Sequence, residues 1–170
     1  MFVQIAPSKF WTPQIREAQL LTLNRTKNTA MIGTADIGDA NDMHPAQKGP
    51  VGERLALAAR ALAYGEHLEY SGPLFAKMKI KRGRAVISFT HTSGGLLAKD
   101  GELKGFTIAG ADTNFVPAKA EIKGKTVVVW SDDVKAPTAV RYGWAKAPDV
   151  NLFNKAGLPA SPFRTDIDQP

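Results

Sequence analysis

The spacing of apolar residues changes near residue 70, and this change constrains the fold more than any other feature of the 170-residue sequence. Before it, short apolar runs alternate with segments whose apolar residues recur every three to four positions, as in amphipathic helices. After it, short segments alternate apolar and polar residues between Gly, Pro, Asp and Asn, which is typical of antiparallel strands. The sequence therefore predicts two parts, residues 1–72 and residues 73–170.

The pattern of residues 1–72 predicts strand, helix, strand, loop and helix in that order. Apolar runs at 2–6 and 29–37 predict the two strands. Pro13 predicts the start of the first helix, because a proline is tolerated where the backbone N–H has no partner in any case. The second helix is expected over 51–66, with Arg54 off its apolar stripe. Strands that alternate with helices form parallel sheets, so the expected class is α/β.

Residues 73–170 are expected to form an antiparallel β-sandwich with an irregular C-terminal tail. Residues 75–81 and 84–91 alternate on either side of an Arg-Gly turn, and residues 118–130 predict a hairpin that turns at Lys123-Gly124. Several short strands at regular spacing are typical of a sandwich. The segment from residue 151 onward has no period and is expected to be irregular.

Composition narrows the possible partners. The net charge is +6, but the densest basic run, residues 77–84, alternates with apolar residues, as a strand with one solvated face does. This favours a solvated strand over a nucleic-acid partner, which needs a contiguous basic surface. No apolar run approaches the roughly 20 residues of a membrane span, so no membrane partner is expected. The absence of cysteine excludes disulfides and thiolate catalysis.

The segment DANDMHP, residues 39–45, is the candidate site. It places His44 beside Asp39 and Asp42, directly after the second predicted strand. Ligands of open parallel sheets bind beyond the carboxyl ends of the strands. A histidine beside carboxylates is a usual general base, and Pro45 restricts the backbone of the residue before it.

A metal site in the same segment is less favoured. Asp36, Asp39, Asp42 and His44 all carry possible ligand atoms. The acids, however, are spaced by three rather than by two as in the calcium loop, and no second histidine lies near. We therefore expect no metal ion and no cofactor.

A base needs a group to deprotonate, and the serines offer no obvious nucleophile. None of them lies in the G-x-S-x-G pattern of hydrolases. The segment HTSGG brings His91 near Ser93, but its position at a strand end favours a plain turn.

A different class of function is also open, in which the chain is a non-catalytic carbohydrate-binding or interaction module and Trp130, Tyr142 and Trp144 stack on sugar rings. Their alternation with polar residues favours core packing instead.

Several motifs resemble one enzyme family, in order and over nearly the whole chain. They are FVQIAP, W-x-x-x-I-R-E-A-Q, TADIGDANDMHPAQKGPVGERLALAA, YSGP, RYGWA and NLFNKAGLPASPFRTD. Together they resemble the C-terminal part of the sialate O-acetylesterases, which are SGNH-type carbohydrate esterases. The segments DMHPAQKGPVGERL and GLPASPFRTD are the most specific. In the first of these segments, Lys48 is expected to have a structural role and Gly52 to let its helix pack closely on the sheet. Gln19, in the motif W-x-x-x-I-R-E-A-Q, is expected to tie the first helix to the loop.

The resemblance implies a serine esterase acting on an O-acetylated sugar, either sialic acid or a related acetylated sugar such as those of xylan. It implies that residues 1–72 are the C-terminal portion of a flavodoxin-like catalytic domain, with the catalytic histidine at His44. The nucleophile and oxyanion hole of this family lie in N-terminal blocks that the sequence does not contain. We therefore expect the N-terminal half of the enzyme to be missing and the chain alone to be inactive. The family suggests a periplasmic or secreted enzyme, although the first residues do not form a signal peptide.

The acid partner of His44 departs from the family pattern. Many SGNH hydrolases place an aspartate three residues before the histidine, where this sequence has Asn41. Asp42 lies two residues before His44, and residues two apart in an extended segment point the same way. The alternatives are a triad with Asp42, with Asp39 as third choice, or a Ser–His dyad in which a backbone carbonyl holds the imidazole.

Overall fold

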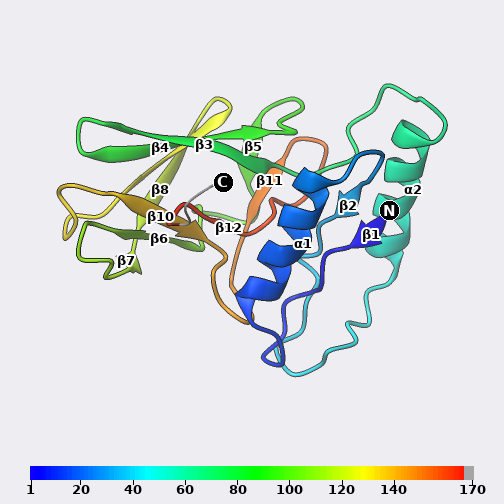
Figure 1. The fold of residues 1–170 in the computed structure, drawn as a ribbon, viewed down its shortest axis with the longest axis horizontal. Helices are drawn as coiled ribbons and strands as arrows, with labels where there is room; N and C mark the ends of the chain where they lie inside the picture. Colours follow the sequence, from blue (N-terminus) through cyan, green and yellow to red (C-terminus); the bar gives the residue numbers. More distant parts are fainter. Residues whose placement is uncertain (167–170) are drawn as a thin grey trace.

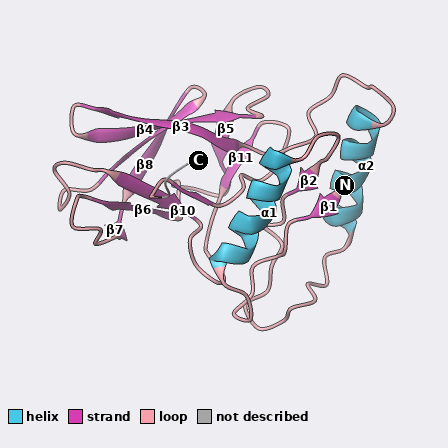
Figure 2. Cartoon of the chain, viewed as in Figure 1, coloured by secondary structure: helices cyan, strands magenta, loops and turns pink. Residues whose placement is uncertain are grey.

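The computed structural model of the chain describes residues 1–166 and shows a mixed α/β fold with two helices and several antiparallel sheets (Figures 1 and 2). Neither helix in this range combines the length and apolar character needed to cross a bilayer. The first part of the chain contains β1 (Phe2–Val3), α1 (Pro13–Arg25), β2 (Met31–Ile32) and α2 (Gly49–Leu62). The remaining strands are β3 (Leu74–Lys81), β4 (Arg84–Thr90), β5 (Leu96–Ala98), β6 (Phe106–Ala109), β7 (Val116–Pro117), β8 (Lys119–Lys123), β9 (Thr126–Trp130), β10 (Ala139–Tyr142), β11 (Leu152–Asn154) and β12 (Phe163–Arg164).

Strands β1 and β2 form a parallel pair, with Phe2 opposite Met31 and Val3 opposite Ile32. Both strands are shorter than the apolar runs predicted, because the chain leaves the ladder soon after Ile32 to form loops. Helix α2 covers one face of the pair, where its Ala58 packs against Ile32. The predicted order of strands and helices is thus confirmed, but two strands do not by themselves define a flavodoxin-like sheet.

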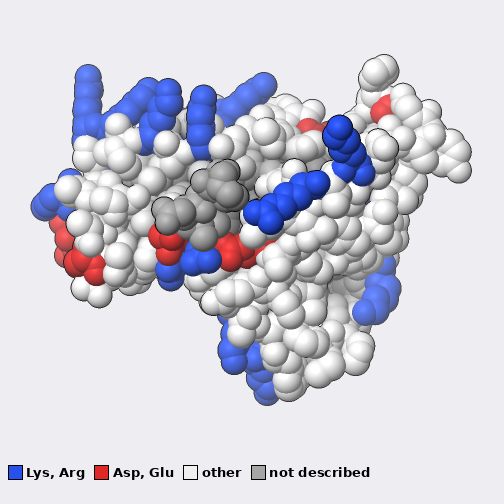
Figure 3. Space-filling view, viewed as in Figure 1, with Lys and Arg blue, Asp and Glu red and all other residues white. Residues whose placement is uncertain are grey.

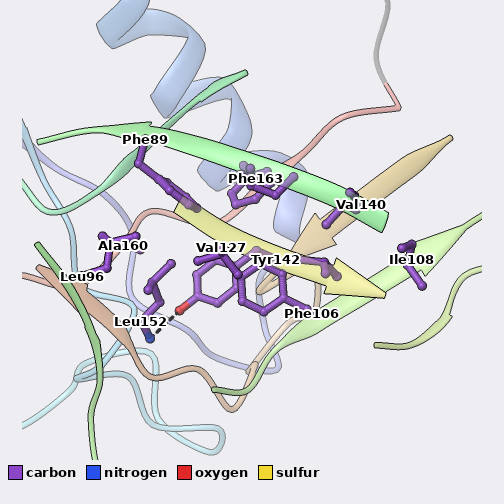
Figure 4. Packing of buried hydrophobic residues seen from close by; sticks show 13 residues of the cluster. Phe89, Leu96, Phe106, Ile108, Val127, Val140, Tyr142, Leu152, Ala160 and Phe163 are labelled. Atoms are coloured by element: carbon purple, nitrogen blue, oxygen red, sulfur yellow. Dashed lines mark hydrogen bonds between the residues drawn. The ribbon is translucent and has the colours of Figure 1, made fainter. Parts of the chain in front are cut away.

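Most strands after residue 73 form two facing four-stranded antiparallel sheets, which is compatible with the predicted β-sandwich (Figure 1), while β5 and β11 form a separate antiparallel pair. One sheet has the order β3-β4-β9-β8 and the other the order β12-β10-β6-β7. Their inner faces share one core, which contains Phe89 and Val127 of the first sheet and Ile108 and Val140 of the second (Figure 4). Alternate burial along β4 and β9 produces this arrangement, because successive side chains of a strand point to opposite faces.

Both predicted hairpins are present. Strands β3 and β4 pair up to Lys81 and Arg84, and the two residues between them, Arg82 and Gly83, both have positive φ angles of 50° and 72°. Two successive positive φ angles match the type I′ turn that suits the twist of a two-residue hairpin. Strands β8 and β9 pair up to Lys123 and Thr126, so this hairpin turns at Gly124, whose φ is 63°, and Lys125, one position later than predicted.

The C-terminal segment is more regular than predicted. Strand β11 pairs with β5 and strand β12 pairs with β10. Side chains from this segment reach the first part of the chain: the buried Gln4 amide donates to Ser161 Oγ at 2.9 Å. A Cβ on Gly72 would lie 1.8 Å from the carbonyl oxygen of Pro159, so only glycine allows this approach. The prediction of an irregular tail missed these long-range contacts, and the division between residues 72 and 73 stays a prediction.

The Tyr142 hydroxyl connects the core to β11, and removing this hydroxyl tests how much the connection stabilises the fold. Its hydroxyl accepts a hydrogen bond from the Leu152 backbone N–H at 3.0 Å, in a fully buried position (Figure 4). Tyr142→Phe leaves that N–H without a partner, which typically costs about 1–3 kcal/mol. Urea unfolding should show this loss, whereas the exposed Tyr64→Phe should leave the free energy of unfolding unchanged.

The hydroxyl of Tyr142 also predicts that the free energy of unfolding falls at alkaline pH. Burial raises the pKa of the Tyr142 hydroxyl well above its ordinary value of about 10. The unfolded chain therefore loses this proton at lower pH than the folded chain does, so the stabilising contribution is complete below about pH 10 and falls as the pH rises further. The decline should be smaller in Tyr142→Phe. An equal decline in both proteins would contradict the assignment.

Candidate active site

Two loops lie together at the carboxyl ends of the parallel strands, at the lower edge of the molecule in Figure 1. One follows β1, and the other connects β2 to α2. The backbone N–H of Lys9 donates to the Ala40 carbonyl at 3.1 Å, and the Lys9 ammonium donates to Asn41 Oδ1 at the same distance. A Cβ on Gly38 would come within 2.3 Å of the Pro7 carbonyl oxygen, so glycine permits the close contact of the loops. The DANDMHP loop thus has the position that the sequence predicts.

A buried ion pair anchors the start of this loop. Arg54 of α2 donates to both carboxylate oxygens of Asp36, at 2.8 and 2.6 Å, and also to the Gly33 carbonyl at 2.8 Å. The Arg54 side chain is only 9% exposed. The sequence did not indicate this burial, because Arg54 lies off the apolar stripe of its helix. The pair joins the beginning of the loop to the helix that ends it.

His44 is exposed on the loop, and Asp42 supports its backbone. Asp42 Oδ1 accepts a hydrogen bond from the His44 backbone N–H at 2.7 Å. The same oxygen lies 3.9 Å from His44 Nδ1, beyond hydrogen-bond distance, and the imidazole is 80% exposed. Asp39 makes the equivalent backbone contact with Asn41, at 2.7 Å. In this structure the two aspartates shape the loop, and neither forms a hydrogen bond with the imidazole.

His44 lies between two residues that border a largely apolar cavity of about 400 Å³. Met43 and Pro45 line it together with Val3 and Ile5 of the first segment and other side chains. His44 itself is not among the lining residues, so the cavity lies beside the backbone of the loop that carries the histidine. The remaining lining residues are Gln4, Ala6, Gln19, Thr34, Ile37, Lys48 and Val51.

Two expectations about neighbouring residues need correction. Gln19 ties α1 to the first strand segment rather than to the loop: its amide donates to the Val3 carbonyl at 3.2 Å and accepts from the Ile5 N–H at 2.8 Å. Gly52 is exposed, and a Cβ there would meet nothing within 4 Å. Close packing of the helix on the sheet therefore does not explain this glycine.

The described residues 1–166 contain no cluster of three or more side chains able to hold a metal ion. Asp36, one of the four possible ligands considered, is occupied by Arg54. Metal ligation by the DANDMHP loop therefore gains no support from the geometry.

The segment HTSGG forms a turn, as predicted. The Gly95 N–H donates to the Thr92 carbonyl at 2.8 Å, and His91, Gly94 and Gly95 all have positive φ angles. The His91 ring lies 2.7 Å from a carboxylate oxygen of Glu69, a partner that the sequence did not indicate. That contact joins the segment before β3 to the end of β4.

The three aromatic residues considered for sugar binding occupy different environments. Tyr142 is fully buried, which fits the favoured core role. Trp144 is half-buried and lies 4.9 Å from the Arg164 guanidinium. Trp130 is half-buried on the outer face of β9 and lies 4.4 Å from the Arg84 guanidinium. They form no common exposed row.

Comparisons with known proteins agree with the motifs, although no family model matches the chain. The chain is 29% identical to the sialate O-acetylesterases of Pongo abelii and Homo sapiens over 171 residues, which is 89% of this chain and 32% of each relative. It is similar in structure to a carbohydrate acetylesterase from Xanthomonas citri, with a TM-score of 0.91 and 46% identity. That match covers 96% of this chain and 40% of the solved chain.

The chain thus spans about a third of the length of the curated relatives that it matches. The similarity extends over the loop that carries His44 and the sandwich alike, because it covers nearly the whole chain. These matches confirm the resemblance of the chain to the sialate O-acetylesterases, which the order of its motifs had indicated.

Proposed function

We propose that the chain is the histidine-bearing part of a serine carbohydrate esterase, one that removes O-acetyl groups from sialic acid or a related acetylated sugar. One observation carries the proposal: His44 lies exposed on the loop at the carboxyl end of the parallel pair, between Met43 and Pro45, which line a cavity. Acetylesterases are the relatives over almost all of the chain.

In the proposed reaction a serine hydroxyl from outside this chain attacks the carbonyl carbon of the acetyl ester. His44 Nε2 takes the hydroxyl proton as the Ser–C bond forms, and then gives it to the sugar oxygen as the ester C–O bond breaks. Water repeats the sequence on the acetyl-serine and releases acetate. The exposed imidazole edge supports this role, because a base must be open to the group that it deprotonates.

Asp42 has a supporting role in this proposal. Its carboxylate holds the backbone of His44 at 2.7 Å, so it fixes the direction in which the histidine leaves the loop. Two arrangements can orient the imidazole ring. In a triad the same carboxylate binds the ring after a small movement, and in a dyad a backbone carbonyl binds it. Asp39 stays the third choice, since it binds the Asn41 backbone.

We also propose that residues 1–72 form part of a flavodoxin-like catalytic domain and residues 73–170 its β-sandwich companion. The parallel pairing of β1 with β2 supports this, since parallel strands with helical connections are characteristic of such sheets. The Gln19 side chain binds the Val3 carbonyl and the Ile5 N–H beside this pair, and so holds α1 against the first strand.

Hydrolysis of 4-nitrophenyl acetate by the chain alone tests its dependence on outside groups. We expect no saturable turnover above that of free imidazole at equal concentration. General-base assistance of about 100- to 10,000-fold has nothing to act on without a positioned hydroxyl and an oxyanion pocket. Saturable turnover well above imidazole would contradict the proposal and direct attention to His91 and Ser93.

A further inference from the structure

The outer face of one sandwich sheet carries a concentration of positive charge. Lys77, Lys79 and Lys81 are exposed on β3, and residues two apart on a strand lie on one face about 6.6–6.8 Å from each other. Arg84 of β4 stands directly opposite Lys81. Figure 3 shows Lys and Arg side chains projecting in a row along the upper edge, over β3 and β4.

An aromatic ring extends this row across the sheet. The Arg84 guanidinium lies 4.4 Å from the centre of the Trp130 ring, and Trp130 of β9 is opposite Lys119 of β8. Because neighbouring strands lie about 4.8 Å apart, the four side chains form a continuous line from one edge of the sheet to the other. Trp130 and Lys119 also line a cavity of about 590 Å³ beside β8. We call this surface, formed by Lys77, Lys79, Lys81, Arg84, Trp130 and Lys119, the cationic face.

Most of these charges lack a carboxylate partner. Among the described residues 1–166, Lys119 pairs with Asp132 at 2.9 Å, whereas Lys77, Lys79, Lys81 and Arg84 form no ion pair. The acids near the face are Asp132 and Glu121, which pair with Lys119 and Lys123, and Glu102 at the cavity. Like charges directly opposite each other, as at Lys81 and Arg84, destabilise a sheet. The arrangement is therefore unfavourable for folding and favourable for an anionic ligand.

The ionisation of Asp132 gives a second sign of the local field. The hydrogen bond from Lys119 and that residue's charge hold the pKa of Asp132 below its usual value, and the charges of Lys135 and Arg84 add to the effect. Positive potential thus extends beyond the single ion pair at this end of the face.

We propose that the cationic face binds an anionic polysaccharide whose sugar rings carry carboxylates. Lysines at regular spacing suit repeated carboxylates, and an aromatic ring beside a guanidinium suits stacking and charge pairing with one sugar unit. Single-stranded nucleic acid is less well matched, because it requires several stacking rings and this face offers one. The choice of a carbohydrate among possible polyanions rests on the proposed acetylesterase function. The prediction that the face binds a polyanion at all rests only on its charge and geometry.

The test measures binding of polysialic acid to the chain at low ionic strength, by affinity electrophoresis or calorimetry. We expect the triple variant Lys77→Gln, Lys79→Gln, Lys81→Gln to bind at least about tenfold more weakly, since steering and attraction scale with the local charge. The matched control removes three exposed lysines from other elements, Lys27, Lys99 and Lys155, and should bind within about twofold of the parent. Binding by the parent should fall as salt is added.

Trp130→Leu separates sugar recognition from charge alone. It should weaken binding of polysialic acid more than binding of polyglutamate, which carries carboxylates but no sugar rings. The inference is overturned if the triple variant and the control bind polysialic acid equally, or if duplex DNA or anionic lipid vesicles bind more tightly than polysialic acid. Circular dichroism confirms that each variant is folded.

Activity toward a small ester keeps this inference distinct from the proposed function. In a chimera in which this chain replaces the matching segment of the Xanthomonas citri acetylesterase, the triple variant should hydrolyse 4-nitrophenyl acetate at the parent rate. If the parent chain does not bind polysialic acid but the chimera hydrolyses the ester, only the proposal of the cationic face is contradicted. If the chimera does not hydrolyse the ester but the parent chain binds polysialic acid, only the esterase proposal is contradicted.

Discussion

Replacing His44 by alanine should reduce acetyl ester hydrolysis by about 100- to 10,000-fold in the chimera with the Xanthomonas citri acetylesterase, which supplies the part that this chain does not span. The physical reason is that a serine hydroxyl is a weak nucleophile at neutral pH until a neighbouring base accepts its proton. Steady-state kinetics should place the loss in kcat rather than in KM, because the proton moves in the transition state.

Matched variants define this result. His67→Ala removes another exposed histidine and should leave activity unchanged. Asp42→Ala should cost less than His44→Ala, because Asp42 contacts the backbone of His44 and stands 3.9 Å from its ring. Asp39→Ala should cost least. Near-parental activity of His44→Ala would show that the loop has no catalytic role.

Removing the buried guanidinium of Arg54 should destabilise the chain by about 3–5 kcal/mol, because Arg54→Ala leaves Asp36 as an uncompensated charge. Denaturant unfolding monitored by tryptophan fluorescence measures the loss. Arg60→Ala serves as the control: Arg60 lies on the same helix and binds Glu66 at the surface, so its removal should change stability little.

The double replacement Arg54→Met, Asp36→Leu identifies the cause. It removes both charges together and should recover much of the stability lost in Arg54→Ala, since apolar side chains of similar volume often replace buried ion pairs without loss. If Arg54→Ala is no more destabilising than Arg60→Ala, the pair does not anchor the loop.

The sequence predicted those parts of the fold that depend on neighbouring residues. Alternation and turn residues located the β3–β4 and β8–β9 hairpins, because a two-residue period and an Arg-Gly or Lys-Gly turn are local properties. Pro13 marked the first residue of α1 for the same reason. The strand β2 ended earlier than its apolar run, since pairing with β1 rather than residue type sets the length of the ladder.

Contacts between distant residues were not visible in the sequence. Gln4 and Ser161 are 157 positions apart, and nothing in their surroundings indicates that they bind each other. Arg16 is buried at 1% exposure because it donates to the carbonyls of Ala145 and Lys146, although charged helix residues usually face solvent. Such polar contacts depend on the assembled fold, which periodicity does not describe.

The candidate site was predictable in position but not in detail. A histidine in a loop after a parallel strand indicated where to look, and the structure places His44 there. The spacing of Asp42 suggested a carboxylate beside the ring, yet that carboxylate binds the backbone instead. A two-residue separation permits either contact, and only the loop conformation decides between them.

Covalent labelling with diisopropyl fluorophosphate tests the central claim that His44 is the base of a serine esterase whose nucleophile lies outside this chain. In the chimera, the label should attach to one serine outside the segment that this chain supplies. His44→Ala should slow the labelling by about 100-fold or more, because the activated hydroxyl is what reacts. Labelling of that serine at the parental rate in His44→Ala, or labelling of Ser93 within this chain, would contradict the account.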